Sequence, residues 1–143
     1  MNNHYRVITK SKNVGEQIAG YHLLVDASGC DSMRIRNHDN LREFVVMLQN
    51  CLALPVRGEP IIERHSTRNL MDSRWSLVQL SNSASISAHF FEDHAVACID
   101  VFLTRLFDVD AVRNVIERYF LPVSMRVTCV NRSFNCATGE ETS

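Results

Sequence analysis

The sequence predicts an α+β fold, a two-layer sandwich in which a mainly antiparallel sheet carries two helices on one face. Two segments with helical periodicity flank a run of alternating segments joined by short polar turns, which are typical of hairpins. The chain has 143 residues, of which 45% are hydrophobic, enough for one domain with its own core. We expect residues 20–132 to form this domain, with an N-terminal arm over residues 1–19 and a flexible tail over residues 133–143.

The first strand and the first helix follow from residues 20–52. Residues 20–27 are mostly apolar and end at Ser28-Gly29, as a buried strand does. Asp39 suits an N-cap, and Pro55 ends the helix that follows it. The apolar residues of this helix recur at helical spacing: Leu41, Phe44, Val45, Leu48 and Leu52.

Four strands are expected between the two helices. The first two cover residues 60–65 and 75–80, with a polar loop between them. The next two cover residues 84–91 and 94–102, and the polar turn Glu92-Asp93 joins them into a hairpin.

The second helix begins after Asp108, which suits an N-cap, and ends before Pro122. Residues 124–130 alternate again and form the last strand. The predicted order is therefore β-α-β-β-β-β-α-β, and both helices cover the same face of the sheet.

Alternation within residues 84–91 divides this strand into two faces, with Ile86, Ala88 and Phe90 on one and Ser85, Ser87 and His89 on the other. We expect the face that no helix covers to contain Ile86, Ala88 and Phe90 or their neighbours. An apolar sheet face that is exposed to water is unfavourable unless a second chain packs against it, so we expect a homodimer.

Charge and composition exclude several classes of partner. The net charge is −1, which argues against nucleic-acid binding because that needs a basic surface. No apolar run reaches the roughly 18–20 residues that span a bilayer, so we expect no membrane partner. The N-terminus is polar and the five cysteines include no C-x-x-C pair, which favours a reducing cytoplasm. No ligand set for a metal is recognisable.

The densest polar cluster covers residues 81–89, where small polar residues end in His89. It is either the wet face of a half-exposed strand or a row of hydroxyls and an imidazole presented to a cleft. Gly-rich phosphate loops, H-E-x-x-H and G-x-S-x-G are absent from the sequence.

Several segments, taken in order, resemble the small prokaryotic S-adenosylmethionine decarboxylase proenzymes. The resemblance covers about residues 20–132. The matching segments are Gly20 to Cys30, Ser76 to Leu80, Ser85 to Phe90, Ile99 to Phe102, Phe107-Asp108 and Tyr119-Phe120.

The resemblance implies a protein that makes its own cofactor. In this family a serine hydroxyl attacks the preceding carbonyl, the resulting ester is eliminated, and the new N-terminus becomes a pyruvoyl group. The pyruvoyl ketone then accepts electrons while S-adenosylmethionine loses carbon dioxide, a step of spermidine biosynthesis. The resemblance places Ser76 at the serine that steadies the oxyanion and His89 at the histidine that removes the proton during elimination.

Two positions depart from the family pattern. The serine that becomes the pyruvoyl group corresponds to Ala84, which has no oxygen to attack with. The catalytic cysteine corresponds to Thr104, whose hydroxyl is a far weaker acid than a thiol.

Three explanations remain open. The chain is a pseudoenzyme that binds S-adenosylmethionine or regulates a partner. Alternatively, Ala84 blocks the processing of an otherwise working proenzyme. In the third, the cleaving serine is shifted by one position, to Ser83 or Ser85; Ser83 follows Asn82, a residue that tolerates a strained turn.

The substrate pocket of the family implies further candidates. Phe90 and Phe91 could stack on an adenine, and Glu92 or Asp93 could reach a ribose, although paired aromatic residues at a strand end are more often core and turn carboxylates are often solvated. The resemblance also leaves room for a homologue that decarboxylates a basic amino acid, ornithine or arginine.

Overall fold

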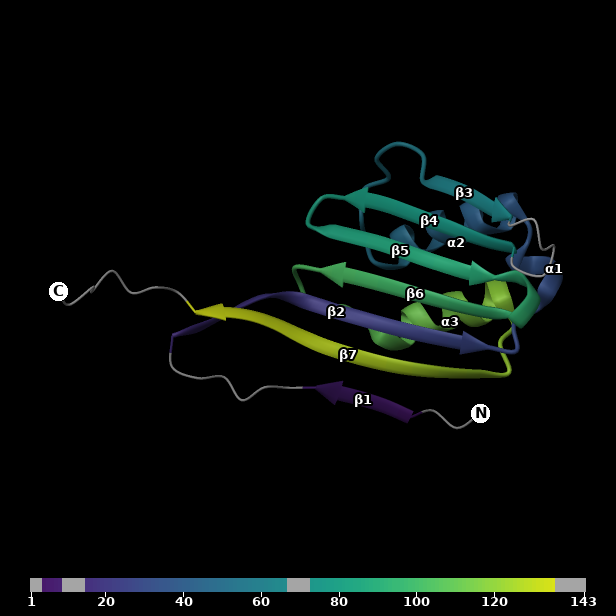
Figure 1. Ribbon diagram of the computed structural model, residues 1–143. Coiled ribbons are helices and arrows are strands. Elements are labelled where there is room, and N and C mark those ends of the chain that lie inside the picture. Colours follow the sequence, from purple (N-terminus) through teal and green to yellow (C-terminus); the bar gives the residue numbers. More distant parts are fainter. Residues whose placement is uncertain (1–3, 9–14, 67–72, 136–143) are drawn as a thin grey trace.

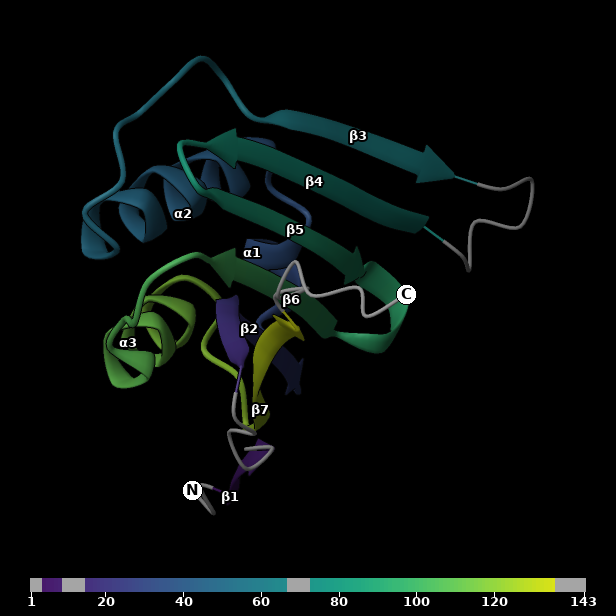
Figure 2. The same ribbon diagram turned by 90° about the vertical axis from the view of Figure 1, so that its left-hand side faces the viewer.

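The computed structural model describes residues 4–8, 15–66 and 73–135. These residues form two layers, a seven-stranded sheet and a layer of helices on one of its faces (Figures 1 and 2). The predicted fold class is confirmed.

The sheet has the strand order β1-β7-β2-β6-β5-β4-β3. All neighbouring strands are antiparallel except β1 and β7, which run parallel. The strands are β1 His4–Ile8, β2 Glu16–Ser28, β3 Ile61–Ser66, β4 Ser73–Ser81, β5 Ala84–Phe91, β6 Val96–Leu103 and β7 Ser124–Asn135. The helices are α1 Ser32–Ile35, α2 His38–Cys51 and α3 Val109–Phe120, with a 3-10 turn η1 at Glu92–His94.

The core lies between the helices and the sheet. Phe44 of α2 packs edge to face on Phe120 of α3, with ring centroids 4.8 Å apart. Phe90 of β5 lies 5.1 Å from the same Phe120 ring, so one aromatic cluster joins both long helices to the central strands. All three rings are fully buried.

The sheet extends further than the sequence pattern indicates. β2 already begins at Glu16 and β7 runs to Asn135, and together they leave the body of the sheet as a two-stranded ribbon (Figure 1). β1 adds a further strand beside β7 within the expected N-terminal arm. The added parts of β2 and β7 are mostly exposed and carry no clear apolar alternation, so the pattern gave no signal for them.

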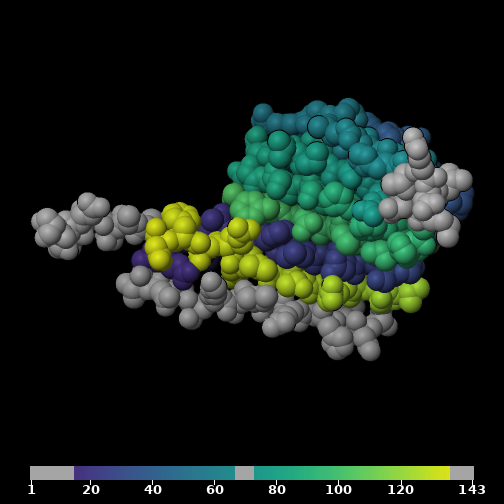
Figure 3. Space-filling view, in the orientation of Figure 1, coloured from purple at the N-terminus to yellow at the C-terminus, as the bar shows by residue number. Residues whose placement is uncertain are grey.

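The two faces of β5 point in the opposite directions from those expected. Ile86, Ala88 and Phe90 face the helices and are at most 1% exposed, so they do not lie on the uncovered face. The helices bring their own apolar stripes to this layer, and only the apolar side of the sheet can complete the core. Ser85, Ser87 and His89 therefore lie on the helix-free face, the side of the sheet seen in Figure 3.

Candidate functional site

Ser76 and His89 form a hydrogen-bonded pair on the helix-free face. They are direct cross-strand partners on β4 and β5, and Ser76 Oγ lies 3.1 Å from His89 Nδ1. A pocket of about 230 Å³ adjoins the pair, and its other lining residues are Ile61, Glu63, Leu77, Val78 and Ser87. The structure thus brings together the two residues to which the resemblance gives processing roles.

Ala84 and Thr104 lie at the other end of β5. Ser81 pairs with Ala84 across a tight turn made of Asn82 and Ser83. The Thr104 N–H donates to the Ser83 carbonyl oxygen at 3.1 Å, which ties this turn to the end of β6. Ser83 has φ of +60°, a left-handed conformation that is strained for a serine.

The Ala84 side chain offers nothing from which a pyruvoyl group could be made. It is 8% exposed and belongs to the hydrophobic core. A methyl group has neither a nucleophilic oxygen nor a leaving group, so position 84 does not fit the cofactor that the resemblance implies.

The two pairs do not meet within one chain. Five residues separate Ala84 from His89, which at a rise of about 3.3 Å per residue is roughly 16 Å along the strand. Residues five apart also point to opposite faces of an unbroken strand, and β5 is continuous over this stretch. The Ser76–His89 pair therefore cannot act on residue 84 of its own chain in this conformation.

The four expected substrate-binding residues do not form one pocket. Phe90 is fully buried in the core, and Phe91 lies under the Arg74 guanidinium at 5.3 Å from the ring centroid. The Asp93 carboxylate accepts a hydrogen bond from the Ser73 N–H at 3.2 Å. The side chains of Phe90, Phe91 and Asp93 are therefore used in contacts within the fold.

The fourth of these residues, Glu92, is a buried carboxylate. Arg64 on β3 donates to both of its oxygens, at 3.0 and 3.1 Å, and Trp75 Nε1 donates at 2.6 Å. The hydrogen bonds from Arg64 lower the pKa of Glu92 despite its burial. Glu92 thus joins the edge strand β3 to the rest of the sheet rather than facing a ligand.

A second pocket on the helix-free face was not expected from the sequence. It has a volume of about 320 Å³ and is lined by His22, Ser85, Ser87, Asp100, Phe102 and Arg132. His22 Nε2 lies 3.1 Å from Asp100 Oδ1. These residues come from four different strands, and only the register of the sheet brings them together. From the sequence, alternation within each strand could indicate only which residues of that strand share a face.

The thiols of the described residues are poor nucleophiles. Burial raises the pKa of Cys30 to about 11 and raises the pKa values of Cys51, Cys98 and Cys129 as well. All four are free. Cys136 lies outside the described residues.

Two further expectations concern metals and membranes. Among the described residues, no three His, Cys, Asp or Glu side chains gather in a way that could hold a metal ion. Within the same ranges, no helix is long and apolar enough to cross a bilayer.

Comparison with known proteins identifies the family. The family model for S-adenosylmethionine decarboxylase matches residues 21–133. Among solved structures, the chain resembles the adenosylmethionine decarboxylase from Aquifex aeolicus, with a TM-score of 0.65 and 19% identity over 89% of this chain and 99% of that chain. No curated protein matches the sequence. Since the family model spans most of the chain, the protein belongs to the S-adenosylmethionine decarboxylase family.

Proposed function

We propose that this chain is a member of the family that stays uncleaved and acts by binding a small ligand and a second protein chain rather than by decarboxylation. The family is in general pyruvoyl-dependent. The observation that carries the proposal is the buried methyl group of Ala84 at the position from which the pyruvoyl group would arise. The ligand class that we propose is S-adenosylmethionine or a basic amino acid, and the compartment is the cytoplasm.

The surroundings of Ala84 support this proposal. Self-cleavage needs a hydroxyl on residue 84 that can reach the carbonyl carbon before it, and the buried Ala84 methyl group supplies none. Thr104 has a hydroxyl where the family has a thiol, so proton delivery to a carbanion is weakened too. Both changes remove chemistry and leave the fold intact.

Mass spectrometry of the denatured protein tests the proposal. We expect one species at the full mass of 16.3 kDa. We also expect no release of carbon dioxide from S-adenosylmethionine and no effect of borohydride, which reduces a pyruvoyl ketone. Two fragments that divide near residue 84 would overturn the proposal.

Ala84→Ser distinguishes this proposal from a proenzyme stopped at a single residue. A working proenzyme should cleave once the hydroxyl is restored. We expect the variant to stay whole, because its own Ser76–His89 pair lies on the other face of the sheet and Thr104 still replaces the thiol.

A second candidate is cleavage at Ser83. Its positive φ in a tight turn is the kind of local strain that favours an acyl shift. Ser83→Ala tests this candidate: fragments that appear in the unaltered protein and vanish in the variant would assign cleavage to Ser83.

For the second chain we propose another copy of this protein. Three exposed apolar side chains gather on the helix-free face of β3 and β4: Ile61 is 61% exposed, Val78 37% and Leu80 68%. A second copy packed against this apolar patch of Ile61, Val78 and Leu80 would remove it from water and would cover the neighbouring Ser76–His89 pair.

A further inference from the structure

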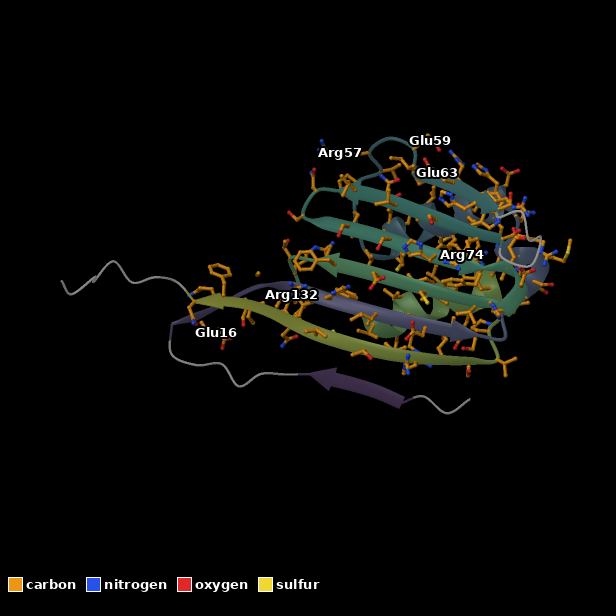
Figure 4. The ribbon with its side chains drawn as sticks, in the orientation of Figure 1. Glu16, Arg57, Glu59, Glu63, Arg74 and Arg132 are labelled. Carbon is orange, nitrogen blue, oxygen red and sulfur yellow. The ribbon has the colours of Figure 1, made fainter. Side chains whose placement is uncertain are left out.

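We propose that the pocket between β5, β6, β2 and β7 binds the α-amino-carboxylate group of an amino acid, with the carboxylate at Arg132 and the ammonium at Asp100. This proposal rests on the ligand-binding part of the proposed function and names the site and the group recognised. Figure 4 labels Arg132 where β2 and β7 leave the body of the sheet. The apolar patch of Ile61, Val78 and Leu80 lies on strands β3 and β4, toward the other edge.

The pocket has one cationic end. The Arg132 side chain makes no hydrogen bond or ion pair with another residue in the part of the chain that the structure describes. Its backbone pairs with Gly20, which leaves the space beside it free of any side chain from β2. A guanidinium presented in this way suits a carboxylate, which it can bind through two parallel hydrogen bonds.

The other end of the pocket holds a carboxylate with room for a donor. Asp100 uses Oδ1 to contact His22 Nε2 at 3.1 Å, and its side chain is 36% exposed. Its second oxygen has no hydrogen bond to a described residue, so it can accept one from a ligand ammonium. Ser87 is the direct cross-strand neighbour of Asp100 and adds a hydroxyl beside it.

The mixed charges of the lining select a zwitterion. A dication would be repelled by Arg132, and a dianion would be repelled by Asp100. A neutral apolar molecule would leave the Arg132 guanidinium and the second oxygen of Asp100 without a partner. A ligand that carries one charge of each sign satisfies both ends at once.

The two charged ends lie on either side of His22. Arg132 and Asp100 lie two strands and about four residues apart, which places their Cα atoms roughly 16 Å apart. His22 is midway between them in the register, where it pairs with Phe102 on β6 and with Val130 on β7. A ligand that contacts both charged groups would therefore lie over the His22 and Phe102 side chains, which line the same pocket.

Phe102 provides a wall for the ligand side chain. It is the cross-strand neighbour of His22 on β6 and lines the pocket. A Cβ at Gly20 would lie only 2.6 Å from Phe102 Cζ, so the ring rests on the glycine backbone. The glycine therefore sets the position of the ring, whose tip lies beside the cross-strand partner of Arg132.

Calorimetric titration of the full chain with L-methionine tests the proposal. We expect binding that weakens at least about 10-fold in Arg132→Gln and in Asp100→Asn. Arg126→Gln is the matched control: Arg126 lies on the same strand and face, but its partner is Asp26 at 2.7 Å, and we expect no change in affinity. Two ligand controls, 3-(methylthio)propylamine and 4-(methylthio)butanoate, each lack one charge and should bind at least about 10-fold more weakly.

Three outcomes would overturn the proposal: no heat of binding at millimolar L-methionine, equal affinity of both substituted chains and the unaltered protein, or equal binding of either one-charge analogue. Arg132 is exposed, so its substitution should not affect folding, and thermal melting checks both variants. Because cleavage is read from the mass and ligand binding from the heat, a failure of this site is distinguishable from a failure of the proposed uncleaved state.

Discussion

Glu92 illustrates how a single side chain can hold an edge strand. Its carboxylate is almost fully buried between Arg64 and the Trp75 indole. We expect Glu92→Ala to lower the free energy of unfolding by about 1–3 kcal/mol, because the substitution leaves the Trp75 N–H without its acceptor. Chemical denaturation measures this loss. Glu63→Ala removes an exposed carboxylate from β3, the strand that carries Arg64, and should change stability little. An equal effect of both substitutions would contradict the assigned role.

The same carboxylate makes stability depend on pH. The pKa of Glu92 is lowered in the folded state, chiefly by the hydrogen bonds from Arg64, so its contribution is complete above the ordinary carboxyl pKa and is lost as the pH falls through the folded value. We expect the unaltered protein to lose stability below roughly pH 4, and Glu92→Gln to lose less over that range. Thermal melting between about pH 3 and 7, the range that covers carboxyl titration, measures the difference. Parallel curves for both proteins would contradict it.

Gly20 is required by close packing rather than by a turn. An added Cβ would lie 2.6 Å from Phe102 Cζ and 2.8 Å from the Leu103 carbonyl oxygen, and the backbone atom cannot move aside. We expect Gly20→Ala to cost about 1–3 kcal/mol in the free energy of unfolding. Gly58→Ala is a control for space, since nothing lies within 4 Å of the Cβ position there, although its φ of +70° adds strain of its own. A neutral effect of Gly20→Ala would contradict this, because both the Phe102 ring and the Leu103 carbonyl would have to move aside.

At the scale of the element, two residues at the start of α2 are candidates for its N-cap. The sequence favours Asp39, whereas in the structure Asn37 is the N-cap and its side chain accepts the Asn40 N–H at 3.1 Å. We expect Asn37→Ala to cost about 1 kcal/mol. Asp39→Ala should cost less, because Asp39 contributes only through the helix dipole and an exposed contact with the His38 ring at 3.4 Å. Denaturation of both variants measures the order, and a larger loss for Asp39→Ala would reverse the assignment.

Helical periodicity and hairpin turns were enough to place the long helices and the central strands. The cap of α3 is Asp108, as the sequence indicates, and its side chain accepts the N–H of Asp110 at 2.9 Å. Periodicity could not reveal the polar ribbon of β2 and β7, because its stability comes from main-chain pairing. It also could not say which face of β5 the helices cover, since alternation defines two faces without naming the covered one.

At the scale of the whole molecule, a binding site spread over several strands depends on the register between them. The sequence singled out Ser76 and His89 through a family resemblance, and the structure joins them by a hydrogen bond. The sequence did not indicate the pocket around Arg132. This residue lies in a polar segment, and only the pairing of the strands places it in the same pocket as Asp100. The local sequence pattern therefore predicts single strands, whereas the arrangement of charges across several strands can be read only from the folded structure.

The proposed dimer now depends on other residues than those the sequence suggested. Ile86, Ala88 and Phe90 are used in the core, and the exposed apolar patch of the helix-free face is Ile61, Val78 and Leu80.

We expect light scattering at micromolar concentration to give twice the chain mass of 16.3 kDa, and Val78→Arg to give the mass of one chain, because a buried guanidinium at the centre of the interface would lack a partner. Val123→Arg is the control, since Val123 is 75% exposed and lies outside this patch. A monomeric unaltered protein, or dissociation by Val123→Arg but not by Val78→Arg, would show that this face stays open to solvent.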